Sequence, residues 1–149
     1  MYNDIVTVFN RKIDDTGDYW YPTVLHNVHV NVDRAAILAK YGETSADSAS
    51  LNVRYQLRDG AKMIEGKRWL LPKEWEKQGD PSEYITFKSG DTFDFFIVGE
   101  WASINPINND EYADLNGFYN YLNKTYDYVF AISSVGEYSV IPHFEILGR

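Results

Sequence analysis

The sequence of 149 residues contains no cysteine. Without cysteine the chain can form neither a disulfide scaffold nor a thiolate zinc site. Basic residues are also scarce, because 14 Lys and Arg stand against 22 Asp and Glu, giving a formal net charge of −8. This balance argues against a basic surface that wraps DNA or RNA, so we expect no sequence-specific nucleic acid partner.

Long apolar runs are absent as well. The longest, residues 95–98 and 128–132, fall far short of the roughly 20 residues that a membrane helix needs. The first four residues contain neither the basic nor the apolar region of a secretory signal. We therefore expect a protein made in the cytoplasm that does not enter a membrane.

Aromatic residues, by contrast, are abundant, with 12 Tyr, 8 Phe and 4 Trp. A chain so rich in aromatic and β-branched residues can bury enough apolar surface to fold, which argues against intrinsic disorder. Its length corresponds to about one domain. We expect a single domain that spans residues 1–149.

Alternation of apolar and polar residues dominates the chain and predicts strands. Residues 5–10 and 51–57 each predict a strand, and residues 20–32 predict a long one. On the long strand one face holds Trp20, Pro22, Val24, His26, Val28, Val30 and Val32, and the other is mostly polar.

Three further patterns complete the β structure. Residues 84–87 and 92–101 predict a hairpin in which Phe93, Phe95, Ile97 and Trp101 share one face. Residues 128–135 and 138–147 predict the two last strands.

Short helices interrupt these strands. They are predicted at residues 33–41, at 72–78 with proline in the first turn, and at 111–122, where Asn108 and Glu111 fit a capping box and Gly117 lies inside. The fold class is therefore mainly β, a small antiparallel β-barrel or sandwich with one to three short inserted helices, and with insertions at about 59–83 and 102–123.

Motifs that would carry chemistry are weak. His26 and His29 differ by three positions on a predicted strand and therefore point to opposite faces, which prevents joint metal binding. Asp94 and Glu100 share a face but lie about 20 Å apart, against the roughly 5–9.5 Å that a glycosidase pair needs. We therefore expect no enzyme and no catalytic, cofactor-binding or metal-binding residues.

The aromatic residues of the inserted segments are the remaining unusual feature. They have three interpretations: anchors that hold the insertions on the barrel, a protein interface, or a platform for sugar stacking. The candidate contact residues in or near these segments are Trp69, Trp75, Trp101, Tyr119 and Tyr121.

Three stretches carry a resemblance to a known class of proteins. They are residues 2–10 (YNDIVTVFN), 20–25 (WYPTVL) and 141–148 (IPHFEILG). In these stretches the chain resembles small proteins from the morphogenesis region of tailed phages and of prophages in gut Firmicutes. The order of its elements is more distantly similar to head-closure, or head–tail connector, proteins. Residues 59–83 and 111–122 depart from a minimal head-closure protein.

The resemblance implies a β-barrel subunit of the virion, made in the bacterial host cytoplasm, which forms a ring between portal and tail-completion proteins without a cofactor. We expect the polar stretch 43–50, with Glu43, Thr44 and Ser45, to contact neighbouring subunits or to line the channel. Two other classes stay open. A carbohydrate-binding or host-recognition module would use the aromatic residues, and a small hydrolase would need an acid pair within about 10 Å in a cleft.

Overall fold

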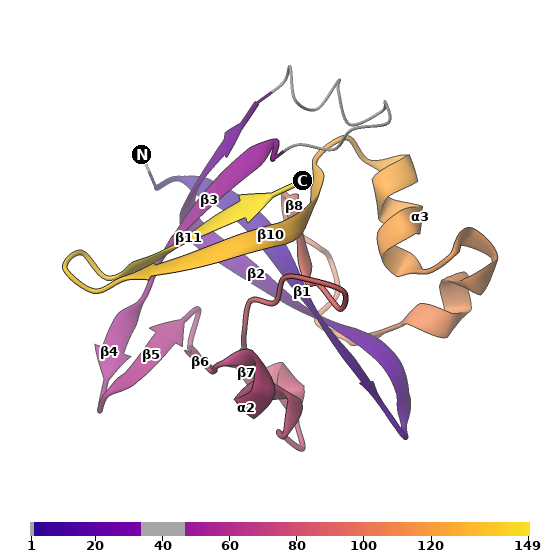
Figure 1. Cartoon of the computed structure of the whole chain (residues 1–149), viewed down its shortest axis with the longest axis horizontal. Helices are drawn as coiled ribbons and strands as arrows, with labels where there is room; N and C mark the ends of the chain where they lie inside the picture. The colour runs from indigo at the N-terminus through magenta and orange to yellow at the C-terminus, as the bar shows by residue number, and fades with distance from the viewer. Residues whose placement is uncertain (1, 34–46) are drawn as a thin grey trace.

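The computed structural model describes residues 2–33 and 47–149. Six antiparallel strands close into a barrel, because β2 pairs with β1 as well as with β3 (Figure 1). The prediction of a mainly β fold is confirmed, and the barrel alternative is the correct one. In their order around the barrel the strands are β1 (Asp4–Asp14), β8 (Phe95–Val98), β10 (Val129–Tyr138), β11 (His143–Gly148), β3 (Ala49–Arg54) and β2 (Gly17–Val32).

The long strand β2 is interrupted by a bulge. Val6 of β1 pairs with Leu25, whereas Asp4 pairs with Val28, so β2 has one residue more than β1 between these two pairs. Asn27 takes up the difference with a φ of 55°. The predicted single apolar face from residue 20 to 32 is therefore wrong, because Leu25, expected on the polar face, is completely buried.

The barrel strands β1, β8 and β10 are buried on both faces. Inside the barrel, Val6, Val8 and Phe96 belong to the main core with side chains from all six strands. On the outside, Phe9 and Phe95 belong to a second cluster that packs beneath α3 (Phe118–Thr125). The predicted shared face of Phe93, Phe95, Ile97 and Trp101 is confirmed, because all four belong to this outer cluster.

The first insertion forms a second, small sheet. Its strands are β4 (Gln56–Arg58), β5 (Ala61–Ile64), β6 (Lys67–Trp69) and β7 (Tyr84–Ile85), in that order. Asp59–Gly60 and Glu65–Gly66 all have positive φ, the conformation that two-residue hairpin turns require. The helix α2 (Pro72–Glu76) and the 3-10 helix η1 (Pro81–Glu83) lie between β6 and β7.

The predicted hairpin of residues 84–87 with 92–101 is wrong. β7 pairs in parallel with β6, and β8 pairs with β1 and β10. Between them the chain closes a compact loop, in which the Asp94 amide donates to the Lys88 carbonyl at 2.9 Å. The Asp94 carboxylate also accepts a hydrogen bond from the Lys88 amide, so the loop is held by a side chain instead of a strand ladder.

The predicted helix 111–122 is split in two. The 3-10 helix η2 (Asn109–Leu115) follows the short strand β9 (Ile107–Asn108), and α3 starts only at Phe118. Asn116 and Gly117 have φ of 62° and 105°, which no α-helix accommodates. Asn108 does cap η2, because its Oδ1 accepts from the Asp110 amide at 3.0 Å. Gly117 is therefore a helix boundary and not an interior position.

The two last strands are confirmed as β10 and β11, but their turn lies at residues 139–142, further along than predicted. The helix predicted at residues 33–41 lies outside the described residues, apart from Asp33. Of the polar stretch 43–50, the last two residues begin β3 and Ser48 is buried.

Candidate functional site

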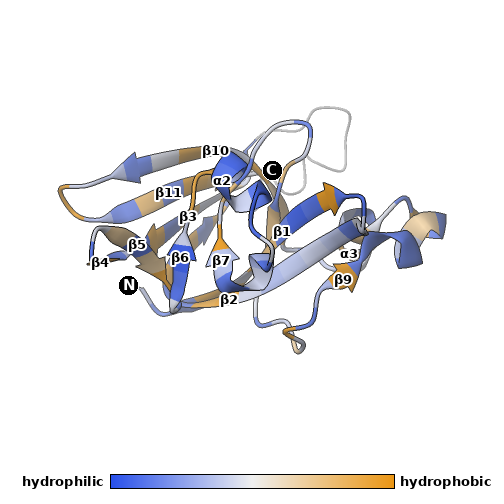
Figure 2. Cartoon of the chain, turned by 90° about the horizontal axis from the view of Figure 1, so that it is seen from below, coloured by the Kyte–Doolittle hydropathy of each residue, from blue (hydrophilic) through white to orange (hydrophobic). Residues whose placement is uncertain are grey.

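The β10–β11 hairpin extends beyond the barrel on the side away from α3 (Figure 1). We call residues 138–142 the hairpin tip. Two aliphatic residues of the hairpin tip are largely exposed to solvent, Val140 at 96% and Ile141 at 71%. Figure 2 shows the apolar colour of this turn at the far end of the hairpin. Because the two apolar side chains are adjacent and protrude, they form a candidate contact surface.

The hairpin tip is held in place by its neighbours. The Tyr138 and His143 rings stack at 4.9 Å with an interplanar angle of 11°. Tyr55 supports both strands, because its hydroxyl donates to the Tyr138 carbonyl and its amide donates to the Pro142 carbonyl, each at 3.3 Å. Lys62 of β5 pairs with Glu137 at 2.7 Å. The apolar pair is therefore presented on a supported scaffold.

A pocket of about 380 Å³ lies near the C-terminal end of α3. Its wall includes Trp101, whose ring packs edge-on against Phe9 and Phe118 at centroid distances of 5.6 and 5.5 Å. Tyr126 on its rim is half exposed. We call this the helix-end pocket; its lining residues are Ile97, Val98, Gly99, Glu100, Trp101, Thr125, Tyr126, Asp127 and Tyr128.

The predicted aromatic contact residues do not come together in one place. Trp75 is completely buried in α2 and offers no surface to a partner. Trp69 packs against the main core, with its ring 4.7 Å from Phe144. Trp101, Tyr119 and Tyr121 pack against the outer cluster, and of the five only Trp101 lines the helix-end pocket. Their main structural role is to anchor the inserted segments.

The other predicted contact residues, Glu43, Thr44 and Ser45, lie outside the described residues. Their expected role, contact with neighbouring subunits or lining of the channel, therefore stays a prediction.

Tyr119 contributes to a pocket of about 300 Å³ together with Arg11, Trp20 and several asparagines. Its polar groups are largely engaged within the protein. Arg11 makes a two-point ion pair with Asp18 at 2.9 and 2.7 Å, and Asn120 donates to the Asn116 carbonyl. The Tyr119 ring meets Phe93 edge-on at 4.9 Å. This arrangement does not resemble an open aromatic platform for a sugar.

A buried polar cluster between β1 and the loop 88–94 is the arrangement closest to a catalytic one. Lys88 Nζ lies 3.0 Å from Glu76 Oε1 and 3.5 Å from Asp94 Oδ1, so two carboxyl groups meet at one ammonium. Burial raises the pKa of Asp94 to about 7, although Lys88 and three hydrogen bonds oppose this rise.

Because carboxyl oxygens of Glu76 and Asp94 both lie within 3.5 Å of Lys88 Nζ, the two acids are close enough for the acid pair of a hydrolase. A substrate, however, has no access to Asp94. Glu76 and Lys88 line a pocket of about 400 Å³ beside α2, whereas Asp94 does not line it and is completely buried. An acid that is completely buried makes no direct contact with a substrate in that pocket. The geometry therefore favours a structural role for Asp94.

Within residues 2–33 and 47–149 no group of three or more His, Asp or Glu side chains is placed to hold a metal ion. In the same part of the chain no helix has the length and apolar character needed to cross a membrane.

Sequence reasoning missed the hairpin tip, because it assigned residues 138–147 to one strand. A local signal was present: Ser139 and Pro142, both frequent in turns, flank the two aliphatic residues.

Comparison with known proteins returns one family. No curated protein and no solved structure matches the chain. Residues 1–149 match a family of unknown function, DUF6751. Because the match covers the whole sequence, the chain belongs to this family of unknown function, DUF6751.

Proposed function

We propose that the protein is a non-enzymatic assembly subunit, specifically a head–tail connector of the head-closure kind in a tailed phage or prophage. The observation that supports an assembly role is the supported hairpin tip with its two exposed aliphatic side chains. The hairpin tip loses little conformational entropy when it docks, because the strands that carry it are already ordered. Its partners would be portal and tail-completion proteins, and its location the virion.

The charge of the chain suits this proposal. A net charge of −8 disfavours tight binding of DNA, and a connector must let DNA slide through its channel. The assignment to a phage neck itself rests on the sequence resemblance.

The test is performed in the bacterium that carries the gene. We expect the protein in purified tailed particles after prophage induction. The double variant V140S/I141S should fold normally and lower the yield of tailed particles by about tenfold, as expected when a central apolar anchor is removed from an interface. I13S is the matched control, because Ile13 is an aliphatic residue with 53% exposure beside the β1–β2 turn, which Figure 1 shows far from the hairpin tip.

Two results would overturn the proposal: absence of the protein from purified particles, or an unchanged particle yield in V140S/I141S. The alternative, a carbohydrate-binding module, is tested on a glycan array. Binding that is lost in W101A would support that alternative. We rank it second because its candidate aromatic residues are divided between the two clusters of the fold.

A further inference from the structure

We infer that copies of this chain associate head to tail, with the hairpin tip of one copy inserted in the helix-end pocket of the next. The inference rests on the proposed function as an assembly subunit and names a second copy of the chain as one partner.

The two surfaces lie at opposite ends of one strand. The pocket includes Tyr128, immediately before β10 starts at Val129, and the tip begins at Tyr138, where β10 ends. Ten residues of extended strand span about 30 Å, so a tip cannot reach the pocket of its own chain. Both views place the hairpin turn and α3 at opposite ends of the molecule (Figures 1 and 2).

The chemistry of the two surfaces is complementary. The tip offers two aliphatic side chains, and the pocket offers Ile97 and Val98 of β8 and the rings of Trp101, Tyr126 and Tyr128. A closed, well-packed contact of this kind would remove from water Val140, the most exposed large apolar residue of the described chain, together with Ile141. Because the two patches differ, repetition of the contact produces a ring or an open filament and not a two-fold dimer.

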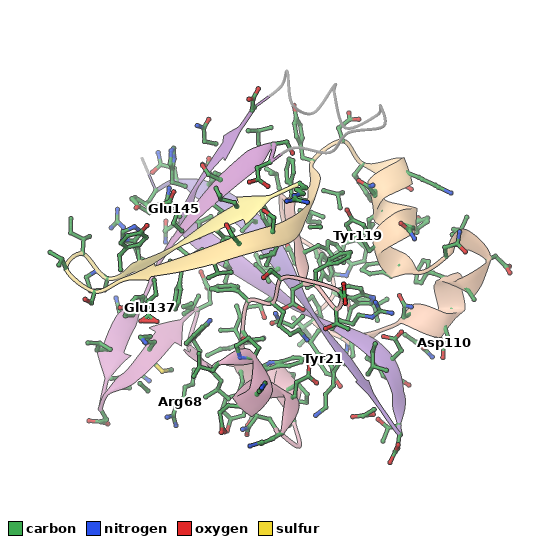
Figure 3. All side chains as sticks on the ribbon, in the orientation of Figure 1. Tyr21, Arg68, Asp110, Tyr119, Glu137 and Glu145 are labelled. Carbon is green, nitrogen blue, oxygen red and sulfur yellow. The ribbon has the colours of Figure 1, made fainter. Side chains whose placement is uncertain are left out.

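The two surfaces also differ in charge. The pocket lining includes the acidic residues Glu100 and Asp127 and no Lys or Arg. Beside the tip, Arg54 of β3 lies opposite His143, and Lys62 pairs with Glu137. Figure 3 shows Glu137 of the hairpin and Tyr119 of α3 on different sides of the molecule. Head-to-tail contact brings the acidic end to the less acidic, arginine-bearing end, whereas tip-to-tip contact brings like ends together.

Disulfide crosslinking between introduced cysteines tests this contact. Because the chain has no native cysteine, only the introduced thiols can form disulfides. V140C places a thiol on the tip, and Y126C places one on the pocket rim, where Tyr126 is 50% exposed. The two variants are mixed, oxidised with copper phenanthroline and analysed by mass. We expect the V140C–Y126C disulfide heterodimer at about tenfold the yield of the I13C–Y126C control, as for a specific contact over random collision.

A second measurement distinguishes the proposed head-to-tail contact from random collision of two subunits. The double variant V140C/Y126C should form a ladder of disulfide-linked oligomers, and added salt should lower its yield because the end-to-end attraction is screened. A heterodimer yield equal to that of the I13C control overturns the inference. A V140C homodimer that exceeds the heterodimer would overturn it too, in favour of a tip-to-tip contact.

The outcome is distinguishable from failure of the proposed function. If the disulfide heterodimer is absent but V140S/I141S still lowers the yield of tailed particles, then the tip docks on a different protein. In that case the head-to-tail inference fails and the connector proposal stands.

Discussion

The buried carboxylate of Asp94 lies 3.5 Å from the ammonium group of Lys88 and fastens a loop to strand β1. Asp94 Oδ2 accepts from Asn10 Nδ2 at 2.8 Å and from the Lys88 amide at 3.0 Å, and Oδ1 accepts from the Arg11 amide at 2.9 Å. One side chain thus replaces several hydrogen bonds of a sheet. Its protonation state should influence the stability of the whole barrel.

The first prediction is a pH dependence that Asp94 causes. Its folded pKa of about 7 lies above the model-peptide value of 3.8, so the folded state retains a proton that the unfolded state has released. The resulting stabilisation is complete below pH 3.8 and is lost as the pH rises through 7. Between these values we expect the free energy of unfolding contributed by Asp94 to fall by about 1.4 kcal/mol per pH unit.

Urea denaturation of the wild type and of D94N at pH 5, 6, 7 and 8 measures this contribution. The wild type should lose stability relative to D94N as the pH rises, because asparagine does not titrate. D91N, at an exposed position of the same loop, is the control and should keep the wild-type slope. Identical slopes in D94N and the wild type would contradict the assignment.

Gly148 marks a close approach inside the barrel. A Cβ atom there would lie 2.7 Å from Phe130 Cβ and 3.0 Å from the Phe96 ring. Both phenylalanines are fully buried and hold opposed positions on β10 and β8, so neither can retreat. We therefore expect G148A to lower the free energy of unfolding by about 1–3 kcal/mol through overpacking.

G79A is the matched control for this substitution. No atom lies within 4 Å of a Cβ built at Gly79, and its φ is not in the left-handed region. Thermal or urea denaturation should find G79A within about 0.5 kcal/mol of the wild type. An equal effect of the two alanines would show that the barrel tolerates the added methyl group.

The sequence allowed prediction of the barrel class because alternation is strong along most strands. It also assigned the shared face of Phe93, Phe95, Ile97 and Trp101 correctly, because parity along an extended chain decides which side chains reach the outer cluster. It could not locate the bulge in β2, whose only local sign is the tolerance of Asn27 for positive φ. Nor could it distinguish a hairpin at 84–101 from a loop closed by Asp94, because the partners Asn10 and Arg11 are remote in sequence.

The candidate site was less predictable than the fold. The aromatic residues were expected either to anchor the insertions or to contact a partner, and only their burial in the folded protein distinguishes these roles. Trp75 is completely buried and is an anchor, whereas Trp101 also lines the helix-end pocket. The hairpin tip became apparent only once β10 and β11 were known to extend past the barrel. Exposure of an aliphatic pair is a property of the tertiary structure, and alternation along the chain does not reveal it.

Asn109 joins the second insertion to the barrel. Its Oδ1 accepts from Trp20 Nε1 and from the Phe118 amide at the start of α3, both at 2.9 Å. N109A would leave both donors without this acceptor, and we expect it to lower the free energy of unfolding by about 2 kcal/mol.

The control for N109A is N105A, at an exposed position in the preceding loop, which should stay within about 0.5 kcal/mol of the wild type. Amide hydrogen exchange adds a local measurement. In N109A the amides of α3 should exchange faster than those of β3, because the lost acceptor holds the first turn of that helix. Uniform acceleration over the whole chain would argue against a specific link to α3.

Trp20 and Trp75 provide a last, paired prediction. Each is almost completely buried, and each has a cation over its ring: Arg11 at 5.2 Å from Trp20 and Lys88 at 4.5 Å from Trp75. They differ in the indole N–H. That of Trp20 donates to Asn109, whereas that of Trp75 has no hydrogen-bond partner among the described residues.

Phenylalanine removes the N–H and leaves a similar gap in both places, so the difference between the two variants isolates the hydrogen bond. We expect W20F to be less stable than W75F by about 1–2 kcal/mol, since W20F breaks a bond whereas W75F removes a buried donor that lacked a partner. Urea denaturation followed by circular dichroism measures both variants without relying on tryptophan fluorescence. If W75F costs as much as W20F, then the Trp75 N–H is satisfied in solution and the packing of α2 on the barrel differs from that described.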